Sequence, residues 1–371
     1  ILTFSLNMST LPLTPQQAQH LNDRGASLLC LDVPCKTFFG IDYLTFEVGP
    51  KFKGVKMVPS GAHFIHTSIQ DDGRMGFFIW LKSKQTEVYQ WDEQIKCLTP
   101  FADKEQAERL CIAVRKGEFD VNLGSYPLQT YAKWKKLSCH IDEAVIRKLG
   151  PNTGVIWSTY SELNHVQQNE EQNENENETK EKESDLHKNY VAAKAKFEHY
   201  HPKYTKITQI KNMKDLTPSQ RTALQMDRST ILYGILERHF KTNELSLLGE
   251  MQYAFICLLV GQSVQGLNHW KDIVDLLSNC CEAVQQKQSF YEQFVQSLLS
   301  QFQELPADFF RDELTNENFL NQSLQSFLEI CNESKLNKDL NKQIQMLTKI
   351  LSQRFDKTFD LETDGPQVVV L

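Results

Sequence analysis

The chain has 371 residues, of which 40 % are hydrophobic and 23 % are charged. This length and composition allow two ordinary domains, each with a sizeable core. The formal net charge is −7, which argues against direct nucleic-acid binding because that function favours a basic surface. The nine cysteines include no CxxC pair, a pattern that indicates buried thiols in a reducing compartment.

The N-terminal stretch "ILTFSLNMST" does not begin with Met, and we expect Met8 to be the natural start. Residues 1–7 lack the charged region and cleavage site of a signal peptide. The longest apolar run, "YAFICLLVG", is shorter than the roughly 20 residues that a membrane-spanning helix needs. We therefore expect no membrane association.

Residues 8–165 are predicted to form a β-rich domain, a sandwich or barrel-like fold with accessory helices. Gly, Pro or Asp punctuates the boundaries of its apolar runs, as between the short strands of such folds. The predicted strands are 27–34, 43–49, 62–69, 75–82 and 86–91. Helical spacing then predicts two helices, 103–117 and 127–138, the first ending at a C-cap on Gly117.

The stretch "GPKFKGVKMVPSGAHFIHT" at 49–67 invites a phosphate-loop or metal interpretation. A P-loop needs Lys directly after its second glycine, but Val55 follows Gly54. His63 and His66 lie three apart on a predicted strand, so their side chains should point to opposite faces and not converge on one ion. We expect one histidine in the core and the other outside, and we expect Asp42 to cap a turn.

An acidic segment at 166–186 follows the β-rich domain. It holds eight acidic residues and two lysines, and its run "QQNEEQNENENETKEKESD" has no apolar side chain to bury, so it is predicted to be a disordered linker. A connecting segment, 187–216, should lead from it into the second domain.

Residues 217–356 are predicted to form an all-helical domain, which makes the whole chain an α+β protein of two domains. Thr217, Pro218 and Gln220 give the signature of a capping box with Pro at the first helical position. The second helix is apolar nearly all round and should be central and buried. Helical periodicity predicts six helices in a compact bundle or a short solenoid, at 217–240, 246–261, 263–284, 289–302, about 317–332 and 337–355.

Candidate catalytic residues are few in this sequence. Ser263 lies between glycines but lacks the spacing of a nucleophile elbow and no predicted strand precedes it. His199 and His201 adjoin the acidic segment, which is a poor platform for a metal, and Cys280 and Cys281 are expected to be buried thiols. We therefore predict no enzyme activity, no catalytic or metal site and no cofactor.

The extended tail, 357–371, ends in "PQVVVL". Pro366 prevents a helix from continuing, and three consecutive valines favour an extended chain. One interpretation is a strand paired with the N-terminal sheet of the same chain. The other is a donor strand that pairs with a sheet edge of a partner. The residues predicted to bind this partner are Gln367, Val368, Val369, Val370 and Leu371.

Several long blocks of this sequence resemble the AAR-two family of splicing factors, in the same order and with similar gaps. They are "FFGIDYLTFEVGPKFKGVKMVPSGAHFIH", "RMGFF", "GSYPLQTYAKWKKL", "LGEMQYAFICLLVGQ", "HWKDIVDLL", "LPADFF" and "PQVVVL". The resemblance runs from about residue 20 to the C-terminus. The sequence departs from the family mainly in its Asn/Glu-rich linker and in ending at Leu371.

The resemblance implies a non-catalytic assembly factor for the U-five small nuclear ribonucleoprotein (snRNP) in the cytoplasm and nucleus. It implies binding to the Prp-eight scaffold through the RNase-H-like and Jab/MPN-like domains of that scaffold, with the tail bridging them. It also implies delayed association of the Brr-two helicase and release under phosphorylation control. Two alternatives remain open: a membrane-trafficking adaptor, which would need a basic lipid-facing patch, and a hydrolase, which would need a polar constellation in the N-terminal domain.

Overall fold

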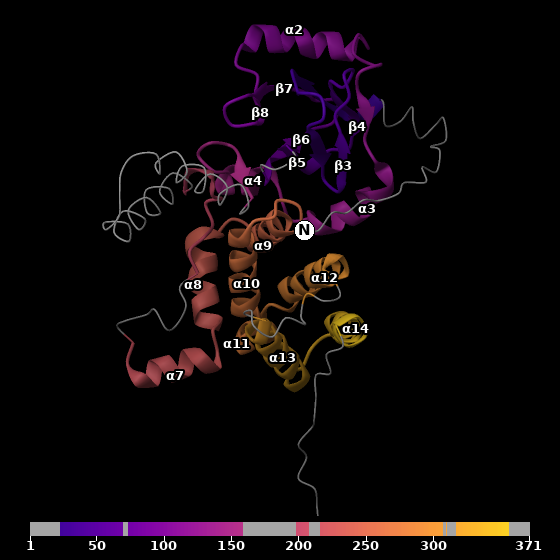
Figure 1. Cartoon of the computed structure of the whole chain (residues 1–371). Coiled ribbons are helices and arrows are strands. Elements are labelled where there is room, and N and C mark those ends of the chain that lie inside the picture. Colours follow the sequence, from indigo (N-terminus) through magenta and orange to yellow (C-terminus); the bar gives the residue numbers. More distant parts are fainter. Residues whose placement is uncertain are drawn as a thin grey trace, which may run out of the picture. The chain divides into compact units, whose positions relative to one another are not determined.

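The computed structural model describes residues 23–69, 73–158, 198–207, 216–306, 309 and 317–355. Residues 1–7, the acidic segment 166–186 and the tail 357–371 therefore lie outside the described residues. The chain divides into two compact units, drawn with their elements in Figure 1. Unit 1 comprises residues 1–204 and 256–266, and unit 2 comprises residues 205–255 and 267–371.

Unit 1 is built on two five-stranded sheets, the first mixed and the second antiparallel, which confirms the predicted β-rich N-terminal region. One sheet has the order β8-β7-β1-β4-β9 and the other has the order β10-β6-β5-β2-β3. The strands are β1 Ala26–Leu31, β2 Phe38–Ile41, β3 Leu44–Glu47, β4 Gly54–Val58, β5 Gly61–Ile69, β6 Gly73–Leu81, β7 Thr86–Asp92, β8 Cys97–Pro100, β9 Gly124–Ser125 and β10 Ile156–Trp157.

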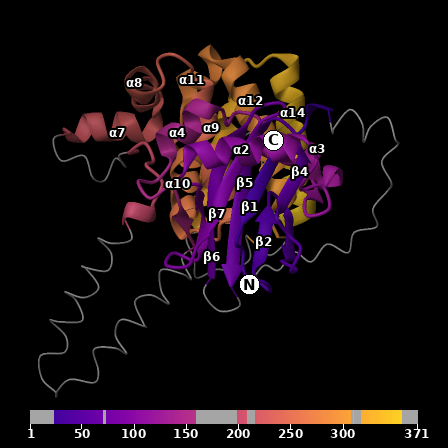
Figure 2. The same ribbon diagram turned by 90° about the horizontal axis from the view of Figure 1, so that it is seen from above.

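The main core of unit 1 takes side chains from both sheets. Leu28 and Val55 of the first sheet and Ile65 and Phe77 of the second belong to one buried cluster. Because strand side chains alternate between faces, each sheet also has an outer face to cover. Helix α2 (Lys104–Arg115) covers that of the first sheet, where Val114 packs in a second cluster with strand residues. Figures 1 and 2 show α2 lying across the strands.

Helices α3 (Leu128–Leu137) and α4 (Glu143–Leu149) contact the second sheet, at β5 and β6 respectively. The indole nitrogen of Trp134 in α3 donates a hydrogen bond to the carbonyl oxygen of Ala62 in β5, at 2.8 Å. β5 is also flanked by a strand on each side, β6 and β2. Side chains on both faces of β5 are buried: Ile65 packs in the main core, Phe64 packs against Phe78 on the other face, and both are 0 % exposed.

Five strands (β2, β4, β8, β9 and β10) and helix α4 were not predicted. All are short, and β4 has no alternation of polar and apolar residues to reveal it. Gly54 shows why its start matters: its φ is +130°, and an added Cβ would lie 1.9 Å from the carbonyl oxygen of Leu28. Only glycine fits this close approach of two strands.

Unit 2 is all-helical over the described residues, as predicted. Its helices are α7 Pro218–Met226, α8 Ser229–His239, α9 Leu245–Leu259, α10 Val264–Ser278, α11 Cys281–Gln286, α12 Gln288–Glu304, α13 Glu317–Glu333 and α14 Lys338–Phe355. The division into units assigns the end of α9 and the start of α10 to unit 1. No helix in the described part of the chain is long and apolar enough to cross a membrane.

The described residues from 218 onward form eight helices, so the prediction of six was wrong. Two predicted helices are each divided, one at Asp227 and the other near Asn279. A hydrogen bond joins the two breaks: the backbone N–H of Arg228 donates to the carbonyl oxygen of Asn279 at 2.8 Å. Asp227 also accepts from Ser229 N–H at 2.9 Å, directly before α8 begins.

The capping box and the buried second helix are confirmed. The side chain of Thr217 accepts from Gln220 N–H, and the Gln220 side chain accepts from the backbone of Thr217. In α9 every residue from 247 to 257 is buried. By contrast, α7 has no buried residue, and both views show it at the periphery of its own unit.

Candidate functional site

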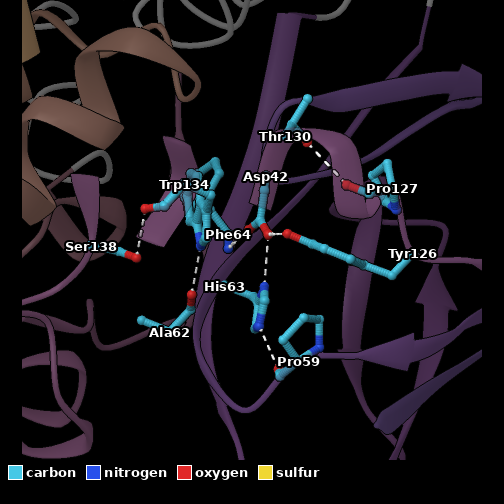
Figure 3. Close-up of polar contacts among 10 residues, drawn as sticks. All are labelled: Asp42, Pro59, Ala62, His63, Phe64, Tyr126, Pro127, Thr130, Trp134 and Ser138. Carbon is cyan, nitrogen blue, oxygen red and sulfur yellow. Dashed lines mark hydrogen bonds and ion pairs between the residues drawn. The ribbon is translucent and has the colours of Figure 1, made fainter. Parts of the chain in front are cut away.

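The predicted partner-binding residues Gln367–Leu371 lie outside the described residues, so the structure does not test them. Within the described chain, the sequence candidates with polar chemistry are Asp42, His63 and His66. The structure brings Asp42 and His63 together with Tyr126, a residue that the sequence analysis did not single out. Figure 3 shows this cluster of three side chains.

Asp42 occupies the two-residue turn between β2 and β3, with a φ of 54°. Such a backbone conformation is uncommon outside glycine but is enriched for Asp and Asn. The turn places its carboxylate against β5, where Oδ1 accepts from the backbone N–H of Phe64 at 2.9 Å. Its Oδ2 accepts from His63 Nδ1 at 2.7 Å and from the Tyr126 hydroxyl at 2.5 Å. Asp42 is 1 % exposed and joins three segments.

The bonding of His63 determines its charge. Nδ1 faces the Asp42 carboxylate and Nε2 lies 2.8 Å from the carbonyl oxygen of Pro59. Both partners can only accept, so both ring nitrogens must donate and the ring is an imidazolium. Burial alone would lower the pKa of His63, but the charge and hydrogen bond of Asp42 outweigh it and raise the pKa.

This arrangement resembles parts of a catalytic relay but offers no free catalytic group. General-base catalysis would need a nitrogen lone pair, and both nitrogens of His63 are engaged. Burial, followed by the charge of Asp42, raises the pKa of Tyr126 and keeps it a neutral donor. The cluster is therefore a cross-link within the fold. Asp42 lies in a turn as expected, but its carboxylate bonds to distant segments and does not cap that turn.

His66 lies on the other face of β5 from His63, as the alternation predicted, but the expectation that one of them lies outside was wrong. They are 0 % and 1 % exposed, because both faces of β5 are covered. An added Cβ on Gly40 would lie 2.0 Å from the His66 ring, so glycine makes the room for it. Its Nδ1 has no hydrogen-bond partner, and burial lowers its pKa well below the ordinary value. Among described residues, no three His, Cys, Asp or Glu side chains gather where they could hold a metal ion.

The remaining sequence candidates have local structural roles. The hydroxyl of Ser263 accepts from Gly266 N–H at 3.3 Å, at the start of α10. His199 is exposed, and a ring nitrogen of His201 lies within hydrogen-bond distance of the Gln265 amide. Cys280 is buried as expected, with its pKa raised by that burial. Its neighbour Cys281 is only partly buried.

Unit 2 contains a buried acid that the sequence analysis passed over. Glu250 lies in α9 at 1 % exposure. Its carboxylate accepts from the backbone N–H and the hydroxyl of Thr205, at 2.5 and 2.9 Å, and lies 2.8 Å from His269 Nε2. A carboxylate inside a helix that is apolar nearly all round needs such partners. A single acidic residue in an otherwise apolar predicted helix was the sequence feature that could have identified Glu250 as a buried acid.

Comparison with known proteins covers both units. A model of the AAR2 N-terminal domain matches residues 24–151, and a model of the AAR2 C-terminal repeat region matches residues 204–360. Protein AAR2 homolog of Mus musculus is 32 % identical to this chain, over 98 % of each sequence. The human protein of that name is 29 % identical over 98 % of each, and that of Caenorhabditis elegans is 29 % identical over 94 % of this chain and 99 % of its own. The chain therefore belongs to the AAR2 (AAR-two) family.

Proposed function

We propose that this protein is a non-catalytic assembly factor of the U-five snRNP in pre-mRNA splicing. The observation that carries the proposal is membership of the AAR2 family, with matches to both the N-terminal domain and the C-terminal region. The described polar clusters are consistent with a binding function, because their groups are bonded to one another inside the fold. The protein would work through its surface, in the cytoplasm and the nucleus, and its release would be controlled by phosphorylation.

The partner in this proposal is the Prp-eight scaffold, bound through its RNase-H-like and Jab/MPN-like domains. Binding would delay association of the Brr-two helicase until the particle matures. Residues Gln367–Leu371 would supply a strand that pairs with the scaffold. In an extended chain Val368 and Val370 face one side and Val369 and Leu371 the other, so a seam between two domains would use both faces.

The first experiment is affinity purification of the tagged full chain from cytosolic extract, followed by identification of its largest co-purifying protein. We expect a spliceosomal scaffold of the Prp-eight type. A clathrin or membrane component in its place would contradict the proposal and favour a trafficking adaptor.

The second experiment removes residues 366–371. We expect affinity for the scaffold to fall at least about tenfold, or about 1.4 kcal/mol, with an unchanged melting temperature of the free protein. A matched control replaces Glu362 and Asp364 by Gln and Asn, which removes nearby charge but keeps the terminal valines. Equal affinities, or a large drop in the melting temperature, would show that the tail belongs to the fold of its own chain.

A further inference from the structure

Unit 1 contains a cavity of about 240 Å³ beside the C-terminal end of α2. Strands β1 and β4, the start of β7 and nearby loop residues, among them Lys84 and Asp120, form the rest of its wall. The residues on which its chemistry depends are Ser27, Lys56, Lys84, Thr86, Arg115 and Asp120. The cavity is separate from the Asp42 cluster, none of whose members lines it.

A β-bulge shapes one wall of this cavity. Ala26 pairs with Val58 and Leu28 pairs with Val55, so β4 has one more residue than β1 across this interval. Met57 at the bulge has a φ of 61°, and both it and its neighbour Lys56 line the cavity. In a regular strand, adjacent side chains would face opposite sides. Bulges that redirect side chains in this way are enriched next to functional sites.

Two further residues of the wall have positive φ angles. They are Lys84, at 62°, and Gly117, at 82°. Non-glycine residues in this region cost about 1–3 kcal/mol each and cluster at binding sites. Met57 and Lys84 are thus two strained non-glycine residues that line one small cavity.

The charges around the cavity favour an anion. Lys84 and Arg115 have no carboxylate partner within the described chain. Lys56 is paired with Asp120, the Nζ–Oδ1 distance being 2.9 Å. Asp23 is the other carboxylate of the lining, and the C-terminal end of α2 also opposes an anion. Three cations thus face two carboxylates, and the excess is one positive charge.

We propose that this cavity binds the phosphate group of a phosphorylated side chain on a partner protein. Its volume is below the roughly 300–1,000 Å³ of whole-ligand pockets, so it suits one anchoring group. The wall offers many hydrogen-bond donors: the forked guanidinium of Arg115, the ammonium of Lys84 and the hydroxyls of Ser27 and Thr86. A carboxylate ligand has only two oxygens and could not engage all of them. A phosphomonoester has three terminal oxygens and up to two negative charges, and Arg-centred clusters are the usual recognition device for it.

The test uses the full chain labelled with ¹³C at its methionine methyl groups. Met57 lines the cavity and reports binding, whereas the exposed Met226 of α7 is an internal control. The probe is N-acetyl-O-phosphoserine amide, titrated beside its unphosphorylated form, the N-acetylglutamate amide and inorganic phosphate. We expect a saturable shift of the Met57 resonance, tightest for the phosphoserine probe, with no shift of Met226.

Variants of exposed residues then assign the contacts. Arg115→Ala should weaken binding about tenfold, or about 1.4 kcal/mol, and Lys84→Ala should also weaken it. Arg109→Ala, a matched cation on α2 outside the lining, should leave it unchanged. Asp120→Asn should tighten binding, because it removes a carboxylate and releases Lys56.

Three results would overturn the proposal. They are the absence of a saturable Met57 shift, a glutamate probe that binds as tightly as the phosphoserine probe, and unchanged binding in Arg115→Ala. Inorganic phosphate binding as tightly as phosphoserine would also overturn it, because the site would then select a free ion. None of these results bears on the binding of the scaffold by the tail.

Discussion

The two units each hold a carboxylate–cation pair inside the fold, but they use it differently. In unit 1, Asp42 joins His63 and Tyr126, which lie 21 and 84 positions away, and the paired side chains are 0 % and 1 % exposed. In unit 2, Asp275 of α10 pairs with Arg228, and these side chains are 12 % and 22 % exposed. The first pair links a turn to a central strand, whereas the second closes breaks between helices.

This contrast predicts that the deeper pair is harder to replace. A buried charge whose partner is removed has no solvent to compensate it, whereas a partly exposed group can still be hydrated. Asp275 in unit 2 also accepts hydrogen bonds from residues other than Arg228. Ser323 of α13 donates to Asp275 at 2.7 Å, and the Asn279 amide donates to it at 3.1 Å.

The largest effect is expected for Asp42→Asn. The substitution keeps the shape of the side chain and tolerates the positive φ, but it removes the charge that balances the imidazolium of His63. We expect the free energy of unfolding to fall by about 3 kcal/mol, the lower end for a broken buried pair, because His63 can lose its proton. Chemical denaturation near pH 6 would measure the difference.

Asp32→Asn is the matched control for this substitution. Asp32 also has a positive φ, 59°, but it is exposed, and its side chain accepts from the Gln90 amide. We expect its effect to lie within about 0.5 kcal/mol. If the two variants lose similar stability, burial of the pair is not what gives Asp42 its importance.

A smaller loss, about 2 kcal/mol, is expected for Asp275→Asn. It weakens a charge-assisted bond to Arg228 and the bonds from Ser323 and Asn279, at 1.5–3 kcal/mol for such a charged acceptor. Asp339→Asn, an exposed acid in the first turn of α14, should change stability by less than about 0.5 kcal/mol. A loss from Asp275→Asn that exceeds the loss from Asp42→Asn would reverse the order that burial predicts.

The two histidines of β5 should give opposite pH dependence. The folded-state pKa of His63 is raised, so its contribution is fully present below the unfolded pKa of about 6.5 and is lost as pH rises through the folded value. The pKa of His66 is lowered, so its contribution is present above about pH 6.5 and is lost as pH falls. His63→Gln should therefore remove about 1 kcal/mol of the decline in stability above pH 6.5.

The measurement is the free energy of unfolding between pH 5 and pH 9, at intervals of about half a unit, which is fine enough to resolve a slope of up to 1.4 kcal/mol per unit. His66→Gln is the comparison, and it should change the acidic side of the curve only. Curves for the wild type and His63→Gln that run parallel above pH 6.5 would show that His63 is not protonated in the folded protein.

The sequence predicted the two classes of structure better than it predicted the clusters. Alternation identified β5 and the opposite faces of its histidines, and helical periodicity identified the buried α9. Neither pattern contains information on pairing across the chain. Tyr126 follows β9, 84 positions from Asp42, so only the fold brings it to that carboxylate.

The two breaks between helices were not predicted, for a different reason. Apolar periodicity continues through Asp227 and Asn279, so it predicts one helix where tertiary bonds stabilise two. Asp227 accepts from the backbone N–H and the hydroxyl of Ser229, and the N–H of Arg228 donates to Asn279. The apolar periodicity contains no sign of either contact. The predicted partner-binding tail remains a prediction, because it lies outside the described residues.

The smallest effect on global stability is expected at the capping box of α7. Thr217→Ala removes the side-chain acceptor for Gln220 N–H, at a local cost of about 1 kcal/mol. Because α7 buries none of its residues, that loss should stay within the helix. Amide exchange in α7 should accelerate about fivefold, the factor that 1 kcal/mol represents, while the global free energy of unfolding stays within about 0.5 kcal/mol.

Asp103→Ala is the counterpart in α2, where the same kind of cap begins a helix packed on the sheet. There the loss should appear in global unfolding, because α2 and the sheet lose their contacts together. An equal global loss in both variants would mean that α7 unfolds together with the rest of its unit.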